Sequence, residues 1–205
     1  MSPADSPPSP SEIPELYTDT HYALRRKVMT VLGNALTVHN SEERLVAYTR
    51  QKALKLREDI RIYADEAQQQ PLLQIQARNI IDFSAMYDVV DVTTDQRIGA
   101  LRRKGAKSLF RDEWSVLDIN DRDIALIRED SMGKALLRRF ATNLIPQAFL
   151  GTSPAGERLF SFKQHFNPLV LKMKLDFSPD ENLVLDRRLG IAAAVLLALI
   201  EGRQD

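Results

Sequence analysis

Hydrophobic and polar residues alternate along much of the chain between Tyr22 and Phe177. In LVLKMKLDF (169–177) every second residue is apolar, and the residues between Leu171 and Phe177 that separate them are charged. DIRIYA (59–64) and LLQIQAR (72–78) show the same period of two. This alternation predicts strands with one buried face and one solvent-exposed face.

Short polar segments separate these strands. They are rich in Asn, Asp, Gly, Ser and Pro, the residues that form tight turns. Consecutive strands joined by such turns form hairpins, and hairpins in series form an antiparallel sheet. A sheet of ten to twelve strands is favoured to close into a barrel, because closure removes the exposed edges. The segments are HNSEE (39–43), DEAQQQP (65–71), TTDQ (93–96), NDRD (120–123) and GTSPAG (151–156).

Two of the hairpins resemble each other. VDVTTDQRIGALRR (90–103) and LDINDRDIALIRE (117–129) both enter the turn through an aspartate between apolar residues. In the returning strands Ile98 matches Ile124 and Arg102 matches Arg128, and one residue of insertion separates the turns. We interpret them as a repeated supersecondary unit.

The last apolar run decides the architecture. No residue from Gly190 to Ile200 has a polar side chain. Eleven helical residues span about 16 Å, roughly half the hydrocarbon thickness of a bilayer, and the adjoining Asp186, Arg187 and Arg188 are costly at membrane depth. We therefore predict a helix over about 183–201 that lies inside the barrel, slim enough because it is rich in Gly and Ala.

The start of this helix has two interpretations. Ser178 to Glu181 has the pattern of a capping box, and Asp186 is a competing N-cap closer to the apolar run. SMGKALLRRFA (131–141) predicts a short surface helix. Residues 1–19 are rich in Pro and Ser and predict a disordered tail, which leaves 20–205 as one domain. The fold class is thus mainly β, a closed antiparallel barrel of about twelve strands around a buried C-terminal helix.

Composition narrows the function classes. The chain has no cysteine, which excludes disulfides and thiolate chemistry. Lys plus Arg and Asp plus Glu are both 28, so we expect no bulk attraction to nucleic acid or to an anionic membrane. A local basic patch can still act over roughly 8 Å at physiological salt. The N-terminus has no basic region followed by an apolar region, which argues against a signal peptide. No stretch reaches the roughly 18 to 20 apolar residues of a transmembrane helix.

Four segments together resemble the LURP-one-related proteins of the tubby C-terminal-like superfamily, which also contains the phospholipid scramblases. They lie between Tyr22 and Gln204 and are YDVVDVTTDQRIGALRRK, RDEWSVLDINDRDIALIRED, FNPLVLKMKLDF and LDRRLGIAAAVLLALIEGR. The resemblance implies a twelve-stranded closed barrel around a hydrophobic C-terminal helix. It also implies, from tubby-like and scramblase-like members, phosphoinositide binding or association with membranes.

The strongest candidate site is LRRKGAKSLFR, which has five cations within ten residues. Arg and Lys side chains at this density predict a clamp for a phosphorylated headgroup. The alternative is a solvated strand end, since acidic residues 112 and 113 follow directly. The candidate anion-binding residues are Arg102, Arg103, Lys104, Lys107 and Arg111.

Two smaller basic clusters accompany it. YALRRK contributes Arg25, Arg26 and Lys27, and LLRRF contributes Arg138 and Arg139. If the three clusters converge in space they form an anion site, and if they scatter they are ordinary surface.

Metal and catalytic signatures are weak. DFSPDEN (176–182) alternates oxygen-bearing side chains as a calcium loop does, but Glu181 replaces the required glycine and Arg187 the bidentate glutamate. The segment 176–182 is better interpreted as the start of the C-terminal helix. The three histidines fit no zinc motif, and Asp82, Asp88 and Asp91 are explained by turns. Phe110 and Trp114 are expected to pack on or in the barrel.

The sequence therefore predicts a non-enzymatic binding or scaffold protein without a cofactor. We expect it in the cytoplasm or peripherally at a membrane, with anionic phospholipid or an unidentified protein as partner and no nucleic acid. Alternatives are a protein-interaction module without a small ligand and a scramblase-like lipid transporter, the latter disfavoured because the apolar helix is needed inside the barrel.

Overall fold

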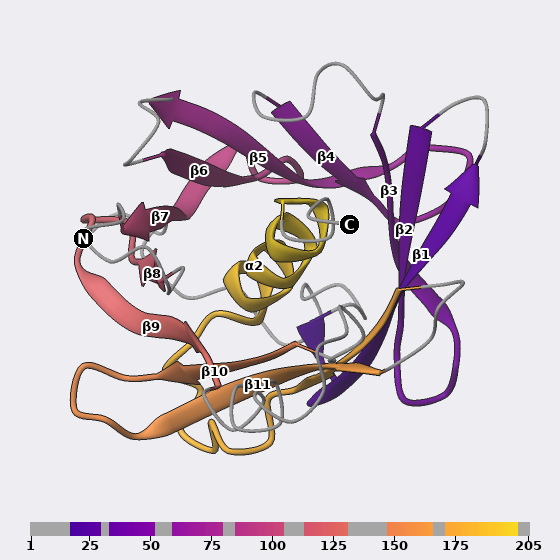
Figure 1. Ribbon diagram of the computed structural model, residues 1–205. Helices are drawn as coiled ribbons and strands as arrows, with labels where there is room; N and C mark the ends of the chain where they lie inside the picture. Colours follow the sequence, from indigo (N-terminus) through magenta and orange to yellow (C-terminus); the bar gives the residue numbers. More distant parts are fainter. Residues whose placement is uncertain are drawn as a thin grey trace.

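Twelve antiparallel strands form a closed barrel, as the alternation predicted (Figure 1). The computed structural model describes residues 17–29, 33–51, 59–79, 85–104, 113–130, 147–165 and 171–200. Each strand pairs with its neighbours in sequence, and β12 closes the ring on β1. The first six strands are β1 His21–Met29, β2 Gly33–His39, β3 Leu45–Gln51, β4 Asp59–Tyr63, β5 Pro71–Asn79 and β6 Met86–Asp91. The others are β7 Gln96–Lys104, β8 Glu113–Leu117, β9 Asp123–Glu129, β10 Ala148–Thr152, β11 Arg158–His165 and β12 Lys172–Asp176.

The two faces of each strand follow the sequence pattern. On β4, Ile60 and Ile62 are buried and Arg61 is exposed. On β12, Met173 and Leu175 face the core while the lysines beside them face outward. The period of two therefore separates the lumen from the outer wall.

Tight turns join β2 to β3, β4 to β5, β6 to β7, β8 to β9 and β10 to β11, all at the end of the barrel where the helix begins. The Asp118 carboxylate illustrates their chemistry, because its Oδ1 accepts hydrogen bonds from the amides of Asn120 and Arg122 at 2.8 and 2.9 Å. One residue in each turn has positive φ, which Asp, Asn and Gly tolerate best. These residues are Glu43, Gln68, Asp95, Asp121 and Gly156.

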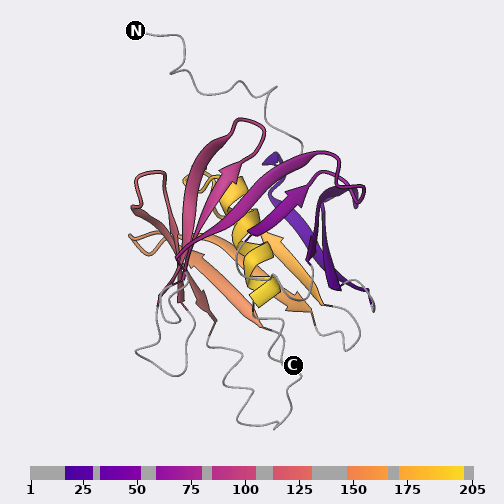
Figure 2. The same ribbon diagram turned by 90° about the horizontal axis from the view of Figure 1, so that it is seen from above.

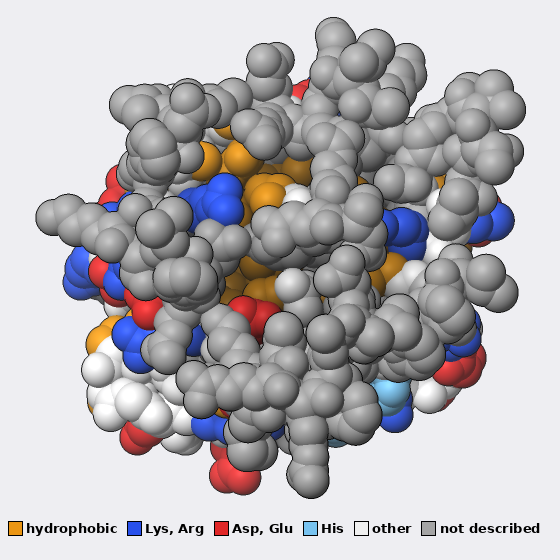
Figure 3. Space-filling view, viewed as in Figure 1, with side chains coloured by type: hydrophobic (Ala, Val, Ile, Leu, Met, Phe, Trp, Pro, Cys, Tyr) orange, Lys and Arg blue, Asp and Glu red, His pale blue; other side chains and the backbone are white. Residues whose placement is uncertain are grey.

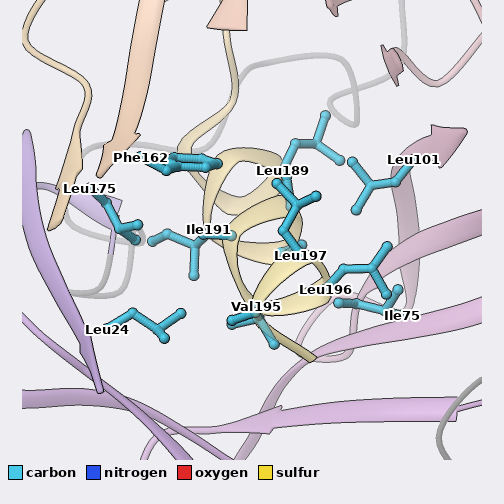
Figure 4. Packing of buried hydrophobic residues seen from close by; sticks show 14 of the residues in the cluster. Leu24, Ile75, Leu101, Phe162, Leu175, Leu189, Ile191, Val195, Leu196 and Leu197 are labelled. Carbon is cyan, nitrogen blue, oxygen red and sulfur yellow. The ribbon is translucent and has the colours of Figure 1, made fainter. Parts of the chain in front are cut away.

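Helix α2, Arg187–Ile200, lies inside the barrel (Figures 1 and 2). Every residue from Leu189 to Leu199 is buried, and inward residues of the strands surround the helix, among them Leu24, Ile75 and Phe162 (Figure 4). The apolar run is thus solvated by the protein's own interior, as predicted. Within the described ranges, no helix is both long and apolar enough to cross a membrane.

The helix begins later than the predicted position near 183. Asp186 is its N-cap, because its Oδ1 accepts a hydrogen bond from the amide of Arg188 at 2.9 Å. Ser178 does not cap the helix. Its hydroxyl donates to Asp176 at 2.7 Å, so the capping-box interpretation was wrong and the segment up to Asp186 forms successive turns.

Gly190 lets the wall approach the helix closely. A Cβ at this position would lie 2.5 Å from the ring of Phe177. That ring belongs to a buried aromatic cluster with Tyr22, Phe160 and Phe162, whose centroids lie 5.8 to 6.1 Å from it. A slim helix therefore allows the barrel to be filled with large aromatic side chains.

Trp114 is also buried in the core, as expected, with its ring centroid 6.1 Å from that of Tyr87. Phe110 and the predicted helix at 131–141 lie outside the described residues. So does the predicted tail up to residue 16. The end of that tail contacts the barrel, since the Asp19 carboxylate accepts hydrogen bonds from the amide and hydroxyl of Ser41.

Candidate functional site

Two arginines at the start of α2 join the helix to the barrel mouth. Arg188 donates to Asp91 at 2.7 Å and also bonds Asp186, and its guanidinium lies 6.0 Å from the ring centroid of Tyr17. Burial raises the pKa of Asp91, but hydrogen bonds from Thr93 and Arg188 and the charge of Arg188 outweigh it, so the pKa lies below its usual value. Burial, with the nearby Asp91 carboxylate, raises the pKa of Tyr17.

Arg187 is held by a second buried carboxylate. The Asp180 side chain is fully buried, and it accepts hydrogen bonds from Arg187 Nη1 at 2.7 Å and from the amides of Val184 and Leu185 at 2.8 and 3.1 Å. Arginine is unfavourable at the positive end of a helix dipole, so these carboxylates compensate it. Asp180 is one of the oxygen-bearing side chains of 176–182 that alternate in sequence as calcium ligands do, and its carboxylate is used by the helix entry. In the parts of the chain that the structure describes, no cluster of three or more acidic or histidine side chains is placed to hold a metal ion.

The predicted anion-binding residues lie at the far end of β7, where α2 ends. Arg102 faces outward and donates to Asp123 at 3.1 and 3.2 Å. Arg103 is opposite the buried Trp114 and so belongs to the inner face, whereas Lys104 is exposed. The three cations therefore alternate between faces, and the other two predicted residues, Lys107 and Arg111, lie outside the described residues.

The cluster on β1 is already engaged. Arg25 pairs with Glu43, and Lys27 pairs with Glu66 at 3.3 Å. Arg26 points inward and donates to the carbonyl of Ala198 at 2.6 Å, which places a cation at the negative end of the helix dipole. Arg26 thus has a structural role that sequence could not reveal.

The clusters on β1 and β7 do not converge. The order of strands places β7 opposite β1, with five strands between them in each direction. Figure 3 looks onto the end of the barrel where α2 ends, and shows hydrophobic side chains at its centre with Lys and Arg on either side. The third predicted cluster, Arg138 and Arg139, lies outside the described residues.

A charge network on the outer wall was missed by the sequence analysis. Arg78 on β5 and Arg97 on β7 both bond Asp88 on β6 and Asp121 in the β8–β9 turn. Hydrogen bonds from Arg78 and then Arg97 lower the pKa of Asp121 to about 2. The network balances two positive against two negative charges, so it fastens neighbouring strands and leaves little net charge for a ligand.

Comparisons with known proteins give a family match over part of the chain. A family model described as LURP-one-related matches residues 45–144, a range that includes β6 to β9. The search of curated proteins finds no match. Among solved structures, the X-ray structure of a protein from Arabidopsis thaliana is similar at 10% identity with a TM-score of 0.48, covering 92% of this chain and 95% of the other. Over residues 45–144, slightly less than half of the chain, the sequence is therefore similar to the LURP-one-related family.

Proposed function

We propose that this protein is a non-enzymatic binding or scaffold barrel that recognises phosphorylated anionic ligands, lipid headgroups among them, through Arg and Lys side chains on its surface. The observation that carries the proposal is the position of α2. Because the helix occupies the lumen, the space in which many barrels hold a small molecule is filled with side chains. Ligands are then bound on the outer wall of the barrel or at its rims. The protein would act in the cytoplasm or at the cytoplasmic surface of a membrane.

The end of β7 supplies the contacts in this proposal. Arg102 is one-third exposed and its partner Asp123 is nearly half exposed, so their ion pair contributes only about 0–1 kcal/mol. A phosphate can take the place of Asp123 at little cost and accept two parallel hydrogen bonds from the guanidinium. Lys104 follows on the same outer face, and Arg103 adds a cation on the inner side of the strand end. Lys107 and Arg111 are the further contacts predicted from the sequence.

Flotation of the protein with liposomes tests this assignment. Vesicles with and without phosphoinositide are compared for the wild type and the variant Arg102→Ala/Arg103→Ala/Lys104→Ala. We expect phosphoinositide-dependent flotation that the variant loses. The matched control, Arg44→Ala/Arg61→Ala/Arg122→Ala, removes the same charge from exposed arginines elsewhere and should float as the wild type does. The proposal is contradicted if the wild type floats equally with and without phosphoinositide. It is also contradicted if the β7 variant floats as the wild type does.

A protein-interaction module is the second candidate. The exposed side chain of Ile119 in the β8–β9 turn favours it, because burying this apolar surface against a partner protein would be favourable. Purification from native lysate without any stable partner would argue against this function.

A further inference from the structure

The strand register brings two lysines face to face on the outer wall. Lys163 on β11 is directly opposite Lys174 on β12, and both are exposed. Directly paired residues have Cβ atoms about 4.5–5.5 Å apart, and like charges at this spacing destabilise a sheet. Neither lysine has a hydrogen-bond or ion-pair partner among the described residues. The pair therefore lowers stability without any visible compensation within the barrel.

The neighbouring row extends this positive surface. Lys172 on β12 lies between Arg25 on β1 and His165 on β11, all on the outer face. The two rows are two residues apart along β12, which is about 7 Å. Like the facing pair, Lys172 has no ion-pair partner among the described residues. We call the three lysines Lys163, Lys172 and Lys174 the lysine face.

Acidic residues near the lysine face are engaged elsewhere. Glu43 pairs with Arg25, and Asp176 in the next row accepts hydrogen bonds from Ser178 and lies 3.4 Å from His21. In the network of Arg78 and Arg97, by contrast, each arginine pairs with two carboxylates. A chain of zero net charge thus concentrates unneutralised positive charge on one wall.

The chemistry of this wall selects among anionic partners. Lysine is a hydrated point charge without the planar fork of arginine, so it suits attraction to a charged surface better than the clamping of one phosphate. The outward residues of the described parts of β1, β11 and β12 include no Phe, Tyr or Trp ring on which a nucleobase would stack. Both properties favour an extended anionic surface over a single-stranded nucleic acid.

Two exposed apolar side chains lie at the rim beyond β12. Leu183 is 71% exposed and Val184 is 47% exposed. They belong to the turns that follow β12, where the amide of Asp180 donates to the carbonyl of Phe177 at 3.1 Å and that of Leu183 donates to Asp180 at 3.2 Å. A wall with exposed lysines and exposed apolar side chains at its adjoining rim has the composition of a surface that lies in a membrane interface, with the cations among headgroups and the apolar side chains below them.

We propose that the wall formed by β11, β12 and β1 docks on an anionic phospholipid bilayer, with the lysine face against the headgroups and Leu183 and Val184 in the interface. This surface is separate from the end of β7, so it adds to the proposed function and does not need that site.

Co-sedimentation with vesicles tests the docking surface. Vesicles of phosphatidylcholine alone are compared with vesicles of equal parts phosphatidylcholine and phosphatidylserine. Each lysine near an anionic membrane contributes about 1 kcal/mol, roughly fivefold in affinity, so Lys163→Gln/Lys172→Gln/Lys174→Gln should weaken binding to the anionic vesicles roughly a hundredfold. Leu183→Ser/Val184→Ser should also weaken it, with unchanged dependence on salt.

The control is the equally charged change Arg44→Gln/Arg61→Gln/Arg122→Gln at exposed arginines outside both surfaces, which should leave binding to phosphatidylserine vesicles intact. The β7 variant assayed with phosphoinositide reports on the proposed function alone. A melting temperature of the lysine variant at or above that of the wild type shows that the variant is folded and that the like-charge repulsion has been removed.

Three results would overturn the docking proposal. The wild type could fail to bind anionic vesicles, or the lysine variant could bind them as tightly as the control does. The lysine face could also bind soluble tripolyphosphate while the vesicles stay unbound, which would assign it to a free phosphate ligand.

Discussion

Arg188 in the first turn of α2 donates through Nη1 to the carboxylate of Asp91 at the end of β6, 97 positions away in sequence, at 2.7 Å. The bond ties the central helix to the barrel wall at the mouth where the helix enters. Both groups are largely removed from solvent, so each depends on the other for compensation of its charge.

Asp91→Asn should destabilise the fold at neutral pH by about 2 kcal/mol, because a hydrogen bond to a charged group is replaced by a weaker one. The pKa of Asp91 is lowered in the folded state, so its stabilisation is present above the unfolded value, about 3.9, and is lost as the pH falls through the folded value. Urea unfolding at pH 7 and in acid should show the gap between wild type and variant closing at low pH. Asp95→Asn, exposed in the same turn, should unfold as the wild type does, and an equal loss there would refute the assignment.

Ala193→Glu and Leu197→Asp should each abolish folding. Both side chains are 2% exposed inside the barrel, and an unpaired buried charge costs several kcal/mol against a total stability of about 5–15 kcal/mol. Soluble expression and circular dichroism measure the outcome. Leu183→Asn is the control, since that exposed residue has a φ of 52°, which asparagine accepts. A soluble, folded Leu197→Asp protein would show that α2 is not the centre of the core.

Gly190→Ala should destabilise the protein by about 1–2 kcal/mol, although alanine is the better helix former by about 1 kcal/mol. The added methyl would lie 2.5 Å from the fully buried Phe177 ring, which has aromatic neighbours on several sides. Thermal unfolding of the single variants and of Gly190→Ala/Phe177→Leu measures their coupling. We expect the double variant to lose less than the sum of the two, and strict additivity would mean that the close contact has no energetic effect.

Asp121 should remain ionised down to about pH 2, because hydrogen bonds from Arg78 and Arg97 favour its charged form. Arg78→Gln and Arg97→Gln should each raise the pKa of Asp121 toward the ordinary value of about 3.9. A carboxyl NMR titration follows this directly. Arg122→Gln leaves the network intact and should not move the titration, and an unchanged pKa in all three variants would exclude the network as its cause.

The faces of the strands could be predicted from the chain because burial acts residue by residue. Ile60 and Ile62 are inside for the same reason that Arg61 is outside, and no knowledge of the partner strand is needed. The position of α2 followed in the same way, since an apolar run too short for a bilayer requires an apolar interior. The start of α2 was predicted near residue 183 because the sequence offers two N-cap candidates. In the structure, the residues around Asp180 form turns, and Asp186 caps the helix.

The candidate sites were less predictable, because a charge acts through its neighbours. Arg26 belongs to a basic triplet in sequence, but in the fold it serves the carbonyl of Ala198, 172 positions away. The lysine face had no signal beyond two lysines on the exposed side of β12, since the register with β11 determines that Lys163 meets Lys174.

The sequence by itself determined which residues are buried and that the last helix is the core of a closed barrel, because hydrophobic burial depends on the period of the pattern and on the length of the apolar run. Only the tertiary structure decided which charges are compensated and which have no ion-pair partner among the described residues. Electrostatic interactions fall off over a few ångströms, and strand register alone sets those distances between residues far apart in the chain.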